Sequence, residues 1–346
     1  MNMNREGFED SLQPPLLAII VPCYNEAEAL PQTIERLCDL VKKLVAAGDA
    51  NAGSSIYFVD DGSRDSTWQV IKTAAVENSA VRGLRLSRNF GHQAAVLAGL
   101  MECDADVFVS IDADLQDDEN CIAEMIAKYR DGAEIVYGVR ASRATDTAFK
   151  RNTAGAYYRL LAALGTKIVV GHADYRLMSR RAVEFFGSFK ERNLFLRGLV
   201  PMIGLPSATV TYDRKERTAG ESKYPLRKML VFAWEGITSL STVPLRAVTT
   251  MGAFVALGAI LLALWVVYQR LFGVGVVPGW ASTLLPIYFL GGIQIFCMGV
   301  LGEYIGKIYI ETKQRPRYLI SEAVGGQELS QLRESRQASL VSARRC

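Results

Sequence analysis

The stretch Val109-Ser-Ile-Asp-Ala-Asp-Leu-Gln-Asp117 carries an apolar run directly into two aspartates, Asp112 and Asp114. Side chains two residues apart on an extended segment point to the same side, so both carboxylates can face one point while Ala113 turns away. Carboxylates at a strand end suit Mg²⁺ or Mn²⁺, held together with substrate phosphates. A solvated acidic turn is the other reading, because Asp-x-Asp is common in turns. The rest of the chain favours the cation site.

Apolar strand-like runs alternate with amphipathic helical runs from Leu17 to Tyr137. This alternation predicts an α/β fold with a mostly parallel sheet and helices on both faces. We expect strands at 17–21, 56–59, 81–86, 107–111 and 135–137. We expect helices at 28–46, 66–76, 92–101 and 120–129. In such sheets, ligands gather at the carboxyl ends of the strands.

The conspicuous polar residues of this region follow the expected strands. They are Tyr24, Asn25 and Glu26 after the first strand, Asp60 and Asp61 after the second, Asp112, Asp114 and Gln116 after the fourth, and Arg140 after the fifth. We therefore expect them to contribute to one ligand site. For Asp60 and Asp61, an ordinary turn followed by a helix cap is the alternative reading.

Two long uncharged stretches lie in the C-terminal third, from Ala247 to Gln269 and from Leu271 to Gly302. About 20 apolar residues are enough to span a bilayer. The stretches predict two transmembrane helices, at about 247–269 and 281–302, joined as a hairpin by a short turn-rich linker. Basic residues flank the outer ends of the pair, so the positive-inside rule assigns both chain ends to the cytoplasm. Two buried core helices are the alternative.

The composition argues against several other classes of protein. A net charge of +3 is too small to indicate a nucleic-acid partner. Six cysteines are scattered without a Cys-x-x-Cys pair, which fits a reducing compartment and gives no zinc framework. Two histidines are too few for a His-rich metal site. The polar, partly acidic start of the chain does not predict a cleavable signal peptide.

Three motifs in chain order carry a resemblance to a known family. They are Val21-Pro-Cys-Tyr-Asn-Glu26, Val59-Asp-Asp-Gly-Ser63 and Asp112-Ala-Asp-Leu-Gln116. The sequence resembles the family 2 inverting glycosyltransferases with the GT-A fold, and more closely their polyprenyl-phosphate branch. That branch includes dolichol-phosphate mannose synthases and bacterial undecaprenyl-phosphate glucosyltransferases. The resemblance covers roughly residues 16 to 318, and its supporting segments are Ser87–Gln93, Asp174–Arg180, Arg217–Tyr224 and the two apolar stretches.

The resemblance implies a role for each motif. Donor and nucleotide contacts would come from Pro22, Tyr24, Glu26, Asp60, Asp61, Asp112, Ala113 and Arg140. The metal on the donor diphosphate would be held by Asp112, Asp114 and Gln116. Phosphates of the donor or of the lipid would be contacted by Arg140, Arg217 and Lys223, since arginine and lysine both suit phosphate. For Arg217 and Lys223, a solvated charge run or contact with anionic headgroups competes with this reading.

Asp174 is the candidate acceptor-side carboxylate, and it shares the catalytic assignment with Asp114. A structural partnership with Arg176 or Arg180 is the alternative. A lipid phosphate is largely ionised near neutral pH, because the second pKa of a phosphomonoester is about 6. Such a nucleophile needs positioning more than deprotonation, so Asp174 is expected to orient the acceptor or a basic residue. For His92 we expect a structural role.

The domain organisation follows from these patterns. Residues 1–14 are expected to be a disordered lead, 15–225 the GT-A catalytic domain, 226–243 an interfacial amphipathic helix, 244–308 the transmembrane pair and 309–346 a cytoplasmic tail that is polar and loosely ordered from Ser321 to Cys346. A core helix of the catalytic domain is the alternative for the amphipathic segment. The chain would be a multi-pass protein of the inner membrane with a cytoplasmic catalytic domain. The resemblance is also compatible with a homo-oligomer.

The expected function is transfer of one sugar from a nucleotide sugar, such as UDP-glucose, to polyprenyl (undecaprenyl) phosphate. The transfer would invert the anomeric carbon, need a divalent metal and serve cell-envelope glycan modification. The chain lacks the Gln-x-x-Arg-Trp motif expected of polymer-forming relatives. A glycan or diacylglycerol acceptor, or a non-catalytic partner of a lipid-sugar flippase, are the alternatives. Asp117-Asp-Glu119 departs from relatives that often carry prolines here, which predicts an altered loop beside the donor.

Overall fold

The structure is a computed structural model that describes residues 13–140 except 115, 172–213 except 193–194, 242–272 and 280–326. The chain divides into two compact units. The first comprises residues 1–158, 167–223 and 315–346, and the second comprises residues 159–166 and 224–314. Predictions that lie outside the described residues are Arg217, Lys223, residues 226–241 of the amphipathic helix expected at 226–243, residues 1–12 of the N-terminal lead and residues 327–346 of the tail.

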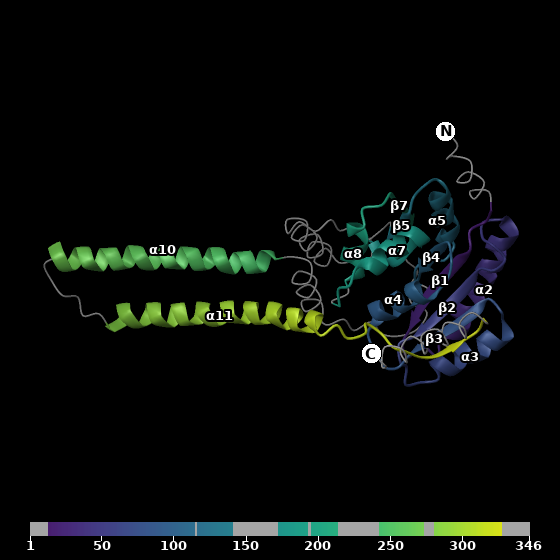
Figure 1. The fold of residues 1–346 in the computed structure, drawn as a ribbon, viewed down its shortest axis with the longest axis horizontal. Coiled ribbons are helices and arrows are strands. Elements are labelled where there is room, and N and C mark those ends of the chain that lie inside the picture. Colours follow the sequence, from purple (N-terminus) through teal and green to yellow (C-terminus); the bar gives the residue numbers. More distant parts are fainter. Residues whose placement is uncertain are drawn as a thin grey trace, which may run out of the picture. The chain divides into compact units, whose positions relative to one another are not determined.

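Within the described residues, the first unit is built on an eight-stranded sheet with the order β7-β5-β6-β4-β1-β2-β3-β8 (Figure 1). Strands β4, β1, β2 and β3 run parallel to one another, as do β5 and β7. Strands β6 and β8 pair antiparallel with their neighbours. The strands are β1 (Leu17–Cys23), β2 (Ser55–Asp60), β3 (Val81–Leu86), β4 (Val107–Ser110), β5 (Ile135–Arg140), β6 (His172–Ser179), β7 (Ser207–Tyr212) and β8 (Ile320–Val324).

Helices cover both faces of this sheet because its central strands are apolar on both sides. On β1, Ile19 and Val21 face a core shared with α2, α3 and α5, whereas Ile20 contacts α4. Gly99 of α4 permits this close approach, since an added Cβ would lie 2.4 Å from Ile20 Cγ2. The helices of this unit are α2 (Leu30–Ala47), α3 (Thr67–Glu77), α4 (His92–Glu102), α5 (Cys121–Arg130), α7 (Arg180–Ser188) and α8 (Leu196–Met202).

The predicted β-α alternation is confirmed from Leu17 to Arg140. Each expected strand and helix of this region is present, with ends shifted by at most a few residues. Asp60 and Arg140 are the last residues of β2 and β5 rather than the first residues after them. The α/β fold with a mostly parallel sheet is therefore correct.

Strand β6 is an element that the hydrophobic pattern did not reveal. It inserts antiparallel between β4 and β5, and its register sets Ser110 of β4 beside Arg176. The Arg176 side chain is only 2% exposed, and an ion pair with Asp174 compensates its buried charge. A strand that buries such a pair lacks the apolar alternation by which strands are predicted. The insertion brings Asp174 to the carboxyl end of β4.

The prediction of a loosely ordered tail is wrong for Ser321 to Val324. These residues belong to β8, which pairs antiparallel with β3 at one edge of the sheet. Glu322 fixes the strand, because it accepts a hydrogen bond from Trp68 Nε1 at 2.7 Å and one from Arg85 Nη1 at 3.3 Å. Pairing with an open sheet edge satisfies the backbone of a five-residue segment that is too short to predict a strand by itself.

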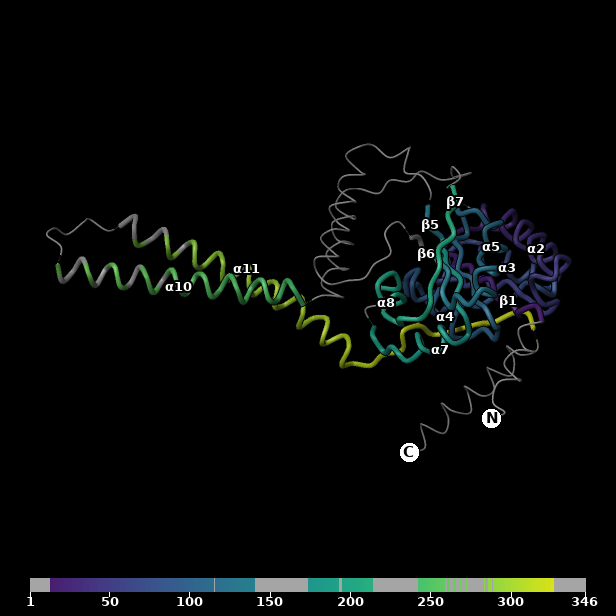
Figure 2. The backbone as a smooth tube through the Cα atoms, turned by 90° about the horizontal axis from the view of Figure 1, so that it is seen from above, coloured from purple at the N-terminus to yellow at the C-terminus, as the bar shows by residue number. Residues whose placement is uncertain are grey.

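The second unit contains two long helices, α10 (Val243–Phe272) and α11 (Trp280–Thr312), which contact each other and run side by side (Figure 2). Both extend beyond the predicted spans. Among the residues whose side chains the structure describes, one segment, Phe289–Thr312, is long and apolar enough to cross a membrane. Val243–Gly258 is a shorter apolar helical segment. The two-span membrane hairpin therefore stays a prediction.

Candidate active site

The candidate site lies where the parallel strands β1, β2 and β4 end. The register aligns Cys23 of β1 with Asp60 of β2, and Ile20 of β1 with Ser110 of β4. The chain leaves these strands into the three motifs that the sequence singled out, so residues far apart in sequence meet at one edge. The loops at this edge usually form the ligand-binding surface of a parallel sheet.

The loop after β1 is joined to the loop after β2 by hydrogen bonds in both directions. The Asn25 backbone N–H donates to Ser63 Oγ at 2.9 Å, and Asn25 Oδ1 accepts from the Arg64 N–H at 2.9 Å. The Glu26 N–H donates to Thr67 Oγ1 at 2.9 Å. Next to these bonds Pro22 is buried and Tyr24 is 40% exposed. The two motifs expected to line a nucleotide pocket therefore form one rigid rim.

Asp60 and Asp61 are almost completely buried. Asp60 accepts the Ser63 N–H at 2.9 Å and lies 3.3 Å from Arg85 Nε. Asp61 accepts the N–H groups of Phe90 and Gly91 at 2.7 and 2.9 Å. Burial raises the pKa of Asp61, and these two hydrogen bonds oppose the rise. Both carboxylates thus hold the protein's own loops, whatever contact they also make with a ligand.

Asp112 and Asp114 are half-buried, while Ala113 between them is buried, as the predicted alternation requires. Helix α2 fixes this turn, because Thr33 Oγ1 donates to the Ala113 carbonyl at 2.8 Å. Partial burial raises the pKa of the Asp112 carboxyl, and the neighbouring carboxylates of Asp117, Asp174 and Asp114 raise it further, although His92 opposes them. Negative charge is therefore concentrated at the end of β4.

The donor atoms at this turn fit a hard divalent cation. Asp112 and Asp114 supply carboxylate oxygens, and the Oε1 atom of Gln116 is buried without a hydrogen-bond partner among the described residues. Within the described residues, no group of three or more His, Cys, Asp or Glu side chains is arranged to hold a metal. A cation here would need further ligands from a substrate diphosphate, which is the usual arrangement for Mg²⁺.

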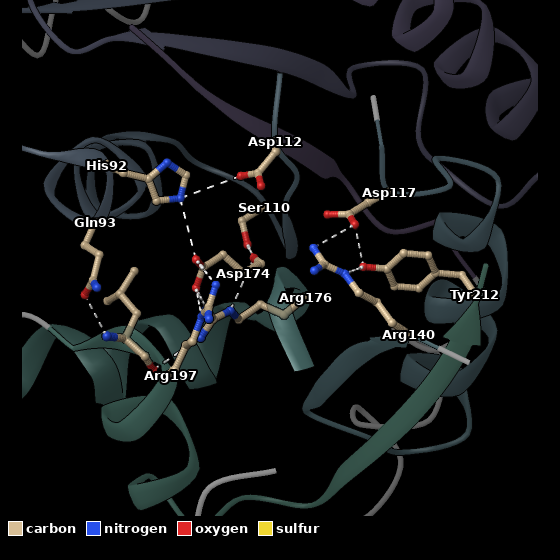
Figure 3. Close-up of polar contacts among 11 residues, drawn as sticks. His92, Gln93, Ser110, Asp112, Asp117, Arg140, Asp174, Arg176, Arg197 and Tyr212 are labelled. Atoms are coloured by element: carbon tan, nitrogen blue, oxygen red, sulfur yellow. Dashed lines mark hydrogen bonds and ion pairs between the residues drawn. The ribbon is translucent and has the colours of Figure 1, made fainter. Parts of the chain in front are cut away.

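Arg140 lies in a second polar cluster with Asp117 and Tyr212. Its Nη2 atom is 3.4 Å from Asp117 Oδ1, its Nε atom is 3.4 Å from the Tyr212 hydroxyl, and that hydroxyl donates to Asp117 at 2.5 Å (Figure 3). The Asp117 side chain is only 2% exposed, whereas that of Arg140 is 30% exposed. Asp117, the first residue of the acidic segment Asp117-Asp-Glu119, therefore anchors that segment to β5 and β7.

The rest of this segment is anchored as well. The Tyr175 hydroxyl donates to the Asp118 carbonyl at 3.0 Å, and Glu119 forms a short ion pair with Arg36 of α2. These contacts fix the loop from Asp117 to Glu119, and its predicted difference in shape from relatives stays a prediction.

Asp174 joins the site from β6 and is surrounded by cations (Figure 3). Arg176 Nη2 donates to its Oδ1 atom at 2.8 Å. Arg197 donates from Nε to Oδ1 at 3.2 Å and from Nη2 to Oδ2 at 3.0 Å. His92 Nε2 lies 3.8 Å from Asp174 Oδ2 and 3.7 Å from Asp112 Oδ1. His92 therefore stands between the carboxylates of Asp112 and Asp174.

The charge state of Asp174 follows from these partners. Burial alone would raise the pKa of its carboxyl, but Arg197 and Arg176 more than compensate and hold that pKa well below its usual value. An ionised carboxylate bonded to two guanidinium groups is a poor proton acceptor. The alternative reading of Asp174 as a partner of Arg176 agrees with the structure. Arg180 instead pairs with Asp104 at 2.6 Å.

Two residues were missed or undervalued at the level of sequence. Arg197 was not singled out, because the surrounding sequence, Leu196-Arg-Gly-Leu199, matches no motif that indicates a function. His92 was given a structural role, yet it lies within 4 Å of both carboxylates. The segment Ser87–Gln93 was the one signal that pointed here. Arg217 and Lys223 lie outside the described residues, so their phosphate-binding role stays a prediction.

The fold and this acidic site together are those of a GT-A glycosyltransferase. The family model described as "Glycosyl transferase family 2" matches residues 18–187. An uncharacterised glycosyltransferase of Bacillus subtilis, YkoT, is 47% identical over 94% of this chain and 97% of its own length. The chain belongs to glycosyl transferase family 2, and it is a glycosyltransferase.

Relatives with a more specific name are also similar along nearly their whole length. The bactoprenol glucosyl transferase of Shigella phage SfX is 42% identical over 88% of this chain and 98% of its own. The prophage bactoprenol glucosyl transferase homolog of Escherichia coli K12 is 40% identical over the same shares. This chain is thus similar to the polyprenol-dependent branch that the sequence motifs indicated.

Among solved structures, glucosyl-3-phosphoglycerate synthase from Mycobacterium tuberculosis, in complex with Mn²⁺, UDP-glucose and phosphoglyceric acid, aligns with 69% of this chain and 83% of that chain. The sequence identity is 18% and the TM-score is 0.45. A likeness of this strength supports no statement about the site. The family assignment rests on the sequence relatives.

Proposed function

We propose that this glycosyltransferase moves one sugar from a nucleotide sugar, with UDP-glucose as the first donor to test, to the phosphate of a polyprenyl phosphate. The product would be a lipid-linked sugar used to modify a cell-envelope glycan. The donor would occupy the rim formed by the loops after β1 and β2, with its diphosphate toward Asp112 and Asp114. The acceptor would approach from the side of Asp174.

One observation carries the choice of acceptor. The family model ends at residue 187, whereas the similarity to the bactoprenol glucosyl transferases extends over 88% of the chain. The shared part therefore includes most of the C-terminal region, with α10 and α11. Apolar helices suit an acceptor that is itself embedded in a bilayer. We infer that both helices span the inner membrane and that the catalytic unit is cytoplasmic.

The residues at the end of β4 would hold a divalent cation with the donor diphosphate. Asp112, Asp114 and Gln116 supply oxygen ligands, and the remaining ligands would be phosphate oxygens. Bound there, Mg²⁺ or Mn²⁺ would neutralise the negative charge that develops on the departing diphosphate. The crowding of carboxylates around Asp112 supports this role, since that charge concentration is costly without a cation.

The transfer itself requires no protein base. A phosphate oxygen of the acceptor donates a lone pair to the anomeric carbon, and a new carbon–oxygen bond forms. The bond from that carbon to the donor diphosphate breaks, and its electron pair leaves with the nucleoside diphosphate. Because the attacking oxygen is already ionised near neutral pH, no proton has to be removed. Asp174, ionised and bonded to two arginines, fits a positioning role in this step.

The experiment that tests this function is a transfer assay with the full chain in detergent. Undecaprenyl phosphate, Mg²⁺ or Mn²⁺ and a panel of labelled nucleotide sugars are mixed with the protein, and the organic phase is counted. We expect label from one donor, dependent on the lipid phosphate and abolished by EDTA. No labelled lipid from any donor, with folded protein, would contradict the proposal. Label in added diacylglycerol instead would identify the alternative acceptor.

A further inference from the structure

Arg197 is held in place from three directions. It is the second residue of α8, and the preceding residue, Leu196, donates its backbone N–H to Gln93 Oε1 of α4 at 2.9 Å. The Leu196 carbonyl accepts a hydrogen bond from Arg176 Nη1 at 3.3 Å. The Arg197 guanidinium forms a two-pronged contact with Asp174 (Figure 3). Its position is therefore set by α4, β6 and its own helix together.

The two arginines on Asp174 differ in what they can reach. The Arg176 side chain is 2% exposed and lies inside the unit. The Arg197 side chain is 34% exposed, although it uses both its Nε and its Nη2 atoms on the carboxylate. Of this pair, Arg197 is the cation that a molecule arriving from solvent can meet. Asp174 thus separates a buried structural arginine from a half-exposed one.

Arg197 is also close to the donor side of the site. Asp174 Oδ2, to which Arg197 Nη2 is bonded, lies 3.8 Å from His92 Nε2, and the same nitrogen lies 3.7 Å from Asp112 Oδ1. The chain of contacts runs from the aspartate at the end of β4 through one imidazole to the arginine. A group bound by Arg197 would therefore sit next to the sugar of a donor whose diphosphate is near Asp112.

We propose that Arg197 binds the phosphate of the acceptor and that Asp174 holds its guanidinium ready for that contact. This inference rests on the proposed function. Guanidinium is planar and presents several N–H donors, so it can bond a carboxylate and a phosphate at the same time. A cation fixed before the substrate arrives loses little conformational entropy on binding. Asp174 is then a positioning residue, and Arg197 is the residue that touches substrate.

A merely structural ion pair between α8 and β6 is the competing explanation. It predicts that loss of Arg197 lowers stability and affects both substrates alike. The proposed role predicts a selective effect on the acceptor, because the donor binds on the other side of His92. The two explanations therefore differ in a measurable quantity, the ratio of the changes in KM for lipid phosphate and for nucleotide sugar.

The test uses the full chain in detergent with undecaprenyl phosphate and the donor found active. For Arg197→Gln we expect kcat/KM for the lipid phosphate to fall about 10- to 100-fold, the cost of losing a charged hydrogen bond, while the KM for the donor stays within about twofold. Arg181→Gln is the matched control, because Arg181 is 60% exposed and contacts Glu134, and it should behave as wild type.

Equal changes in the KM for the lipid phosphate and the KM for the donor, or no change in either, would overturn the role of Arg197. If Arg197→Gln melts far below wild type, Arg197→Lys replaces it, since lysine keeps the charge for Asp174 and loses the two-pronged geometry. A raised KM for the lipid alone then supports the proposal, and an unchanged one overturns it. Failure of the wild type to label any lipid would instead contradict the proposed function.

Discussion

Two pairs of aspartates follow parallel strands of the same sheet, and they are used in opposite ways. Asp60 and Asp61 are 0% and 3% exposed, both accept backbone N–H groups, and Asp60 also lies 3.3 Å from Arg85 Nε. The Asp112 side chain is 39% exposed and lies near His92 and three other carboxylates. The first pair holds the protein's own loops, whereas the second adds to a concentration of carboxylates at the end of β4.

This difference shows how a residue's chemistry depends on its neighbours. All four residues read alike in sequence, as acidic side chains at strand ends. In the structure, the pair after β2 ties loops together, and the pair after β4 concentrates negative charge that a bound cation would relieve. We therefore expect changes at the first pair to act on stability and changes at the second to act on turnover.

The largest effect is expected for Asp112→Asn. Transfer to lipid phosphate should fall by about 100- to 1000-fold, the usual range for losing one charge-stabilising group in an active site. The melting temperature should equal or exceed that of wild type, because folding currently disfavours the ionised form of this carboxyl. Activity near the wild-type level would show that Asp112 is not needed for transfer. A much lower melting temperature would show that Asp112, like Asp60, stabilises the fold.

Asp60→Ala should give the reverse result. It leaves the Ser63 N–H without its acceptor and removes one of the two carboxylates that Arg85 faces, at a cost of about 2 to 3 kcal/mol in the free energy of unfolding. That corresponds to a melting temperature lower by about 5 to 10 °C. Asp60→Asn keeps one oxygen for Ser63 and should lose less. Unaltered melting of both variants in thermal scans would show that this pair is not structural.

A smaller effect is expected at the edge strand. Glu322→Ala removes the acceptor for Trp68 Nε1 and the partner of Arg85, so the melting temperature should fall by about 3 °C. Glu322→Gln retains an acceptor for Trp68 and should fall by about 1 °C. Because Arg85 also faces Asp60, the donor KM is worth following in both variants. Identical melting of the two variants would mean that the Trp68 bond contributes nothing.

The smallest effect is expected for an ion pair on the open surface. Asp39 and Lys42 lie 3.4 Å apart, with side chains 57% and 72% exposed. Such pairs contribute little, because water screens them. Asp39→Asn should therefore change the melting temperature by less than about 1 °C and leave transfer unaffected. A change as large as that of Asp60→Ala would contradict the link drawn between burial and stability.

The sequence predicted the first half of the fold well because its information is local. Each strand and helix from Leu17 to Arg140 has its own apolar pattern and turn. Strand β6 was missed because its buried Arg176 is stabilised by a partner rather than by apolarity. Strand β8 was missed because it is only five residues long, and it pairs with the open edge of β3.

The site was predicted in parts for the same reason. Asp112 and Asp174 were both singled out, each from its own motif, but their proximity comes from the pairing of β4 with β6. Arg197 becomes a site residue only through its contact with Asp174, which no local pattern records. Local sequence patterns therefore do not predict the contacts that depend on the insertion of β6 between β4 and β5.

The most direct test of the account is the anomeric configuration of the lipid product, read by NMR from the couplings of the anomeric proton and the phosphorus. A single displacement by the acceptor phosphate, with Asp174 only positioning, predicts inversion: an α-linked nucleotide sugar gives a β-linked lipid phosphate sugar. Retention would contradict the account, because it would require a second displacement with a nucleophile that we do not assign to this site.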